Sequence, residues 1–139
     1  MSGIGAFKGY YMRHRSGWGD SWIYLDRQGA PVLAIDPRAP DRLWLGGGAV
    51  GTTDDGAASY KIRLEGLGGM GGFAFLESGT YVFGGRDTLV AFRSPDRGEH
   101  WHRLRVPPGV QGAISVAVDP SGRVLIGTRL TGVWRYTPE

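Results

Sequence analysis

Eight consecutive residues carry the strongest structural signal in this chain: Ser94-Pro95-Asp96-Arg97-Gly98-Glu99-His100-Trp101. The Ser94 hydroxyl and the Asp96 carboxylate are short acceptors that can hydrogen-bond nearby backbone N–H groups. Gly98 can adopt a positive φ without steric cost, and Trp101 supplies a large apolar ring that can cover a hairpin. The segment therefore predicts a tight turn between two β-strands, with its own packing anchor.

Similar segments recur along the chain about every 40 residues, which is the period of a four-stranded unit. Each unit has a short apolar strand, then an apolar triplet typical of a strand buried on both faces, then a strand that leads into a turn. An outer strand with alternating polar residues follows, expected from Trp101 to Val106. The aligned segments are Ala34-Ile35-Asp36-Pro37, Ala74-Phe75-Leu76-Glu77 and Ala117-Val118-Asp119-Pro120, followed by Leu43-Trp44-Leu45-Gly46, Tyr81-Val82-Phe83-Gly84 and Val124-Leu125-Ile126-Gly127.

The pattern Ser94-x-Asp96-x-Gly98-x-x-Trp101 resembles the Asp-box, or BNR repeat, of sialidase-like, sortilin-like and xyloglucanase-like β-propellers. That resemblance implies an all-β fold of propeller blades, each of four antiparallel strands. It also implies that the box is a structural turn, on the face away from the binding site. A second box is expected at Thr52, Asp54, Gly56 and Tyr60, with one extra residue before the aromatic position. The Asp-Pro pairs at Asp36 and Asp119 are interpreted as turn starters.

The 139 residues are interpreted as one propeller-type domain of about three blades. Residues 1–30 are expected to supply the third and fourth strands of a partial blade, and 31–67 and 68–109 one complete blade each. Residues 110–139 are expected to supply strands one to three of a last, partial blade. Since propellers close with typically four to eight blades, such an arc exposes strand edges.

A homodimer that closes a six-bladed ring is therefore expected. In this interpretation the strand Trp22-Ile23-Tyr24-Leu25 completes the last blade of a second copy, beside Val133-Trp134-Arg135. Thirteen strands are one too many for such a ring, because Tyr10 to Arg13 and Val133 to Tyr136 compete for one position. A larger multiple would keep the strand exchange but change the ring.

Composition excludes several classes of site. The chain has no cysteine, so no disulfide framework or thiolate metal site is expected, and no nucleotide or metalloprotease motif occurs. No cofactor and no metal are predicted, although His100-x-His102 leaves a weak divalent site as an alternative. The net charge of +3 is spread along the chain, so neither a nucleic-acid nor a membrane partner is predicted. No apolar stretch has the length of a signal peptide or a membrane span, and the compartment stays open.

A ligand site is predicted on the rim opposite the box turns. Arg86 and Arg129 each lie two residues past an aligned glycine, so the repeat places them at matching positions of adjacent blades. Two guanidinium groups that face one funnel could hold a carboxylate or sulfate bidentately, with Asp87 and Lys8 nearby. The simpler alternative is that these are solvated loop arginines.

The favoured function is a non-enzymatic binding or scaffold propeller that recognises a carbohydrate or an acidic protein segment through these rim loops. The alternative is a fragment of a sialidase-like or xyloglucanase-like glycoside hydrolase, which needs two carboxylates across a cleft. Arg105-Val106-Pro107 resembles a sialidase motif, but it follows a box instead of lying near the start of the domain. No catalytic residue is predicted.

Overall fold

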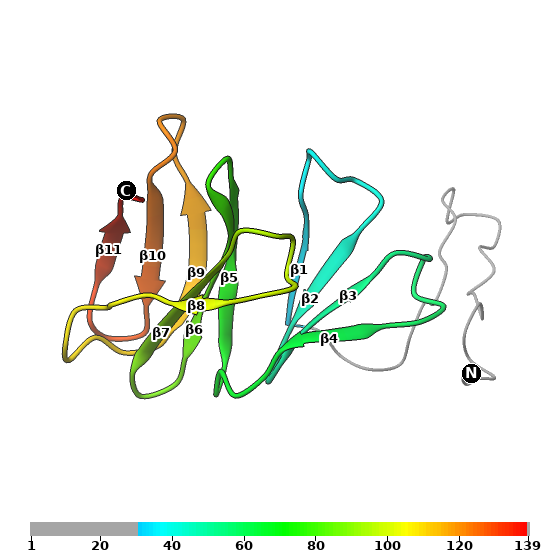
Figure 1. The fold of residues 1–139 in the computed structure, drawn as a ribbon. Coiled ribbons are helices and arrows are strands. Elements are labelled where there is room, and N and C mark those ends of the chain that lie inside the picture. The colour runs from blue at the N-terminus through cyan, green and yellow to red at the C-terminus, as the bar shows by residue number, and fades with distance from the viewer. Residues whose placement is uncertain (1–30, 139) are drawn as a thin grey trace, which may run out of the picture.

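The computed structural model describes residues 31–138. These residues form three antiparallel β-sheets, of four, four and three strands, none of which closes on itself (Figure 1). Residues 31–138 contain no α-helix. The prediction of an all-β chain built from antiparallel sheets is confirmed.

Each sheet is a meander, in which strands that follow one another in sequence pair with one another. The first sheet contains β1 (Val32–Ile35), β2 (Leu43–Gly46), β3 (Val50–Thr53) and β4 (Lys61–Leu64). The central sheet contains β5 (Met70–Leu76), β6 (Gly79–Gly85), β7 (Leu89–Ser94) and β8 (His102–Arg103). The third sheet contains β9 (Ala113–Val118), β10 (Val124–Thr128) and β11 (Val133–Tyr136).

The three sheets stand in a row, with the central sheet between the other two (Figure 1). Two apolar clusters lie in the two spaces between them. Between the first and central sheets the cluster is built on Trp44, Val50, Leu67, Phe73 and Val82; between the central and third sheets it includes Tyr81, Phe83, Leu89, Val124 and Ile126. We call these two spaces the first junction and the second junction.

Close approach of β5 to β9 depends on two glycines. A Cβ atom at Gly71 would lie 2.5 Å from the Cβ of Ala113, and one at Gly72 would lie 2.8 Å from the Cβ of Val116. Real Cβ atoms essentially never approach so closely. Part of the glycine content of the chain is therefore required by the packing of neighbouring sheets, in addition to turns.

The apolar triplets differ in their burial. Tyr81, Val82 and Phe83 are all buried, as predicted for a strand covered on both faces. The prediction is wrong for Leu125, which is 37% exposed, because its side of the third sheet has no neighbour among the described residues. On the first sheet Leu33, Ile35 and Ile62 share the corresponding uncovered face and are 61%, 53% and 56% exposed.

The outer strand of the central sheet is shorter than predicted. Pairing with β7 is limited to β8, although the N–H of Leu104 still donates to the carbonyl of Ala91 at 2.8 Å. Two prolines, Pro107 and Pro108, follow and have no N–H to donate, so the chain leaves the sheet and leads toward β9.

Candidate functional site

The turn between β7 and β8, which we call the Ser94 turn, is organised by two side chains. The buried Ser94 Oγ donates to Asp96 Oδ1 at 2.9 Å and accepts from the N–H of Gly98 at 2.7 Å. Asp96 Oδ1 also accepts from the N–H of His100 at 2.8 Å, and the His100 ring bonds the other carboxylate oxygen. These bonds, that of the His100 side chain first, hold the pKa of Asp96 far below its usual range.

A second turn between β3 and β4, the Thr53 turn, has the same hydrogen-bond pattern. Thr53 Oγ1 donates to Asp55 Oδ1 at 2.8 Å and accepts from the N–H of Ala57 at 3.0 Å. Asp55 Oδ1 accepts from the N–H of Ser59 at 2.9 Å. Hydrogen bonds to Ser59, then to Thr53, lower the pKa of Asp55 to about 2.

The Thr53 turn lies one residue later than the sequence pattern predicted, and no residue is inserted. Thr52 is instead buried on the sheet, where it accepts a bond from Arg63 Nε at 2.8 Å, and Asp54 is paired with Arg42 Nε at 2.8 Å. The position of Gly98 is taken by Ala57, which has a φ of 78°. A non-glycine residue rarely adopts this conformation, which is why the sequence pattern indicates Gly56 instead of Ala57.

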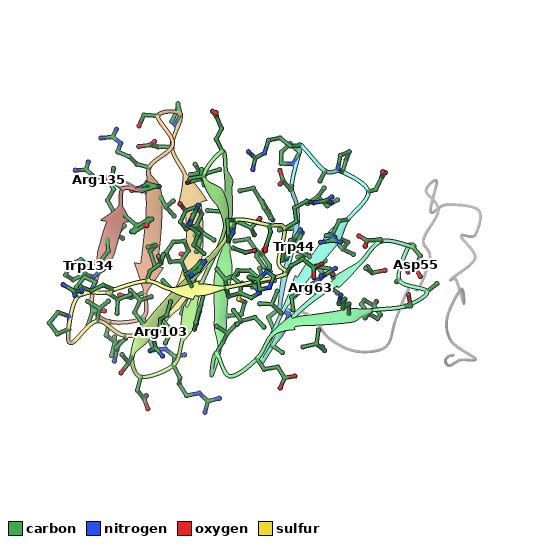
Figure 2. The ribbon with its side chains drawn as sticks, viewed as in Figure 1. Trp44, Asp55, Arg63, Arg103, Trp134 and Arg135 are labelled. Carbon is green, nitrogen blue, oxygen red and sulfur yellow. The ribbon has the colours of Figure 1, made fainter. Side chains whose placement is uncertain are left out.

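The Ser94 turn extends from the central sheet over the first junction and accepts hydrogen bonds from two arginines of the first sheet. Its Arg97 carbonyl accepts from Arg42 Nη1 at 2.7 Å, and its Glu99 carboxylate accepts from Arg63 Nη1 at 2.7 Å. Arg63 is almost entirely buried, with only 4% of its side chain exposed. Figure 2 shows Arg63 beside Trp44 at this junction.

Aromatic rings also pack against one another in the first junction. Trp44 lies edge-on to Trp101, with ring centroids 6.3 Å apart, and contacts Phe73 and Phe75 of β5 at 5.7 and 5.9 Å. Gly98 has a φ of 94°, and a Cβ atom there would lie 2.8 Å from the Trp44 ring. The glycine of the turn is therefore required twice, by its conformation and by its neighbour.

The predicted rim residues lie on two loops at the same end of neighbouring sheets, the lower end in Figure 1. Arg86 and Asp87 are in the β6–β7 loop and Arg129 is in the β10–β11 loop, and all three are exposed. The linker that enters β9 connects these loops, because the N–H of Gly112 donates to the Arg86 carbonyl at 3.0 Å and Gln111 Oε1 accepts from the N–H of Leu130 at 3.1 Å. Lys8 lies outside the described residues.

Two hollows lined by described residues lie elsewhere. Two cavities of about 440 and 500 Å³ lie in the second junction and share Leu104, Arg105, Tyr136 and Thr137 as lining residues. We call the hollow that they form the β11 groove. Neither cavity is lined by Arg86 or Arg129, so the predicted rim lies outside the β11 groove.

Several residues of the β11 groove were not predicted as site residues, including Tyr81, Arg93 and Tyr136. Tyr81 contacts Tyr136 across the junction at 5.7 Å between ring centroids. No local sequence signal identifies such residues, because the groove forms only where strands from two repeat units lie against each other.

A third cavity, of about 300 Å³, lies beside the Ser94 turn and is lined by residues that include Asp36, Arg38, Glu77 and Arg97. Asp36 is already bonded, since it accepts from the N–H of Arg38 at 3.0 Å as expected of a turn starter. Asp119 does the same for Ser121 at 2.9 Å, and its pKa is lowered to about 2 by bonds to Arg123 and Ser121.

Within residues 31–138 no three His, Asp or Glu side chains gather closely enough to hold a metal ion. The same part of the chain has no helix long and apolar enough to cross a membrane. Neither a model of a known protein family nor a curated protein matches this sequence. The function is therefore inferred from the arrangement of its own residues.

Proposed function

We propose that this chain is a non-enzymatic binding or scaffold module built of propeller blades, which recognises a carbohydrate or an acidic protein segment on its rim. Three features support blades of this kind: antiparallel meanders, sheets that pack face to face in a row, and equivalent turns in consecutive sheets. The Ser94 and Thr53 turns have the hydrogen bonds that an Asp-box motif would be expected to form.

One observation supports the ligand site: the linker that enters β9 is hydrogen-bonded to both the loop of Arg86 and the loop of Arg129. Gln111 bonds the β10–β11 loop twice, through its Oε1 to Leu130 and through its N–H to Thr131 Oγ1 at 3.2 Å, and the adjacent Gly112 bonds Arg86. Both arginine side chains are exposed and make no hydrogen bond or ion pair within the described part of the chain. Their guanidinium groups are therefore available to bind a carboxylate or sulfate group bidentately.

Binding to an array of acidic glycans and to acidic peptides tests this proposal. The double variant Arg86→Ala/Arg129→Ala should weaken binding of the best ligand by at least about tenfold, because each charge-assisted bond contributes about 1.5–3 kcal/mol. The control Arg103→Ala removes an exposed arginine that lies over Phe92 instead of on the rim. Equal binding by the double variant and the control would contradict the proposal.

Hydrolysis is the second candidate, and one observation favours it: the cavity of about 300 Å³ has two carboxylates, Asp36 and Glu77, in its lining. A glycosidase uses such a pair as acid and as base or nucleophile. If fluorogenic glycosides are turned over, and Glu77→Gln abolishes the turnover while the rim variant does not, the chain is an enzyme and the binding proposal fails.

A further inference from the structure

The two junctions of this molecule are built on corresponding residues. Trp44 pairs across its sheet with Ala34, and Tyr81 pairs in the same way with Ala74, so each ring faces the next sheet along the row. At Trp44 the neighbouring space is filled by Trp101 and the rest of the Ser94 turn. At Tyr81 the corresponding space is the β11 groove.

The groove is apolar with a basic edge. Its walls are the aromatic and aliphatic side chains of two sheets, and its edge includes Arg93, Arg105 and Arg135. No carboxylate of residues 31–138 lines either of its cavities. The apolar lining includes Phe83, Leu89, Ile126, Trp134 and Tyr136. Trp134 is 38% exposed, and Figure 2 shows it with Arg135 at the far end of the row.

The strand beside the groove lies at the edge of its sheet. β11 is the last strand of its sheet, so within residues 31–138 only one of its edges is hydrogen-bonded. An edge strand next to an apolar groove accepts an extended segment, whose backbone pairs with the strand and whose side chains enter the groove. The basic edge favours a segment that carries a carboxylate.

We propose that the β11 groove binds residues 19–25 of a second copy of this chain, Gly19-Asp20-Ser21-Trp22-Ile23-Tyr24-Leu25. The spacing of its key residues is that of the Ser94 turn. There, Glu99 reaches Arg63 while Trp101, two residues later, packs on Trp44. In the groove Asp20 reaches Arg105 while Trp22, two residues later, packs on Tyr136, the partly exposed ring that lies against the buried Tyr81.

The topology favours a second copy over the chain's own segment. Six residues lie between Leu25 and Val32, so the seven steps from one to the other span at most about 25 Å when fully extended. About 20 Å of this is used by the two sheet spacings between β1 and the third sheet, before the segment turns outward to reach β11. Two copies related by a two-fold axis would form two such contacts and would also cover exposed apolar residues such as Leu33 and Ile35.

A charge exchange between full-length chains tests the proposal by sedimentation equilibrium. Asp20→Arg and Arg105→Glu should each weaken self-association by at least about tenfold, because each places like charges at both contacts. Arg105 is exposed, so its variant should fold normally, which circular dichroism checks. The matched control is Arg103→Glu, an exposed position outside the groove lining, and it should associate like the unaltered chain.

Mixing the two weakened variants distinguishes a second copy from the chain's own segment. In the mixed dimer the arginine introduced at position 20 faces the glutamate introduced at position 105, and at the other contact the unaltered Asp20 faces the unaltered Arg105. Association should therefore return to the level of the unaltered chain. If the groove bound its own segment, mixing would restore nothing, and the proposal would be overturned. It would be overturned equally if neither variant weakened association.

The inserted ring gives a second, independent test. Trp22→Ser should weaken the dimer by at least about a hundredfold, because both contacts lose a buried aromatic ring, the kind of side chain that dominates the centre of interfaces. Trp18→Ser, four residues earlier, is the control and should leave the dimer mass unchanged. Equal effects of the two substitutions would contradict insertion of Trp22.

Discussion

The first and second junctions differ in what fills the space beside a large aromatic residue. At the first junction the Ser94 turn brings a carbonyl, a carboxylate and an indole ring onto the neighbouring sheet, and Arg63 and Trp44 are buried. At the second junction Tyr81 is equally buried, but it and the partly exposed Tyr136 line a groove that no turn of residues 31–138 fills. A turn that satisfies its own backbone therefore has a second role, since it joins two sheets.

The largest difference is expected on removal of an indole ring from each junction. Trp44→Ala should lower the free energy of unfolding by about 3–5 kcal/mol, because the ring is 2% exposed and contacts three other rings. Trp134→Ala should cost less than about 1.5 kcal/mol in dilute solution, since the ring is partly exposed. Urea unfolding measures both values. Equal losses of the free energy of unfolding would contradict the account of a first junction that encloses its indole ring.

Replacing one glycine by alanine in each of the two turns should separate the cost of a positive φ from the cost of contact with Trp44. Gly98→Ala should cost about 2–4 kcal/mol, because it combines a positive φ with contact of the new Cβ with Trp44. Gly56→Ala also has a positive φ, but its Cβ would meet nothing within 4 Å, so the loss should be about 1–2 kcal/mol. If the two variants lose the same stability, the turn does not press on Trp44.

The buried hydroxyls of the two turns should matter about equally for the turns themselves. Ser94→Ala and Thr53→Val each leave a backbone N–H without its acceptor, which should cost about 1–3 kcal/mol. Hydrogen exchange should show a further difference, because Ser94→Ala should also reduce amide protection in β4, across the first junction. Protection of β4 that stays unchanged in Ser94→Ala would argue against coupling of the turn to the first sheet.

In dilute solution, where the chains are single, acid should affect the first junction before the second. The hydrogen bond from Arg63 lowers the pKa of Glu99 from its ordinary value of 4.5, so its contribution to stability is present above pH 4.5 and is lost as the pH falls through the lowered pKa. No carboxylate of the described residues lines the β11 groove. Hydrogen exchange at pH 5 and pH 3 should show faster exchange in β4 at the lower pH, and Glu99→Gln should reduce that difference.

The sequence predicts those features that depend on local hydrogen bonds. The Ser94 turn follows from the order of its own residues, and the strands follow from the alternation of apolar positions. The Thr53 turn lies one residue later than predicted because Ala57 adopts a positive φ, which the sequence pattern expects of glycine. Arg63 is a charged residue on an outer strand, and nothing local indicates that Glu99, 36 positions away, allows its burial.

The candidate sites also differ in whether the sequence alone predicts them. Arg86 and Arg129 could be chosen from the repeat alone, since equivalent positions fall on equivalent loops. The bonds of Gln111 that connect these loops depend on how two sheets pack, so they could not be anticipated. The β11 groove is a difference between the two junctions, and it becomes visible only when Trp44 and Tyr81 are compared in the folded chain.

The mass of the unaltered chain in solution tests most directly whether a second copy completes the second junction. Light scattering on the native chain should give about 30 kDa, twice the chain mass of 15.0 kDa. The mass should fall toward that of a single chain on dilution, because the contacts form between copies. A well-folded species that keeps a mass of 15.0 kDa at every concentration would contradict the account.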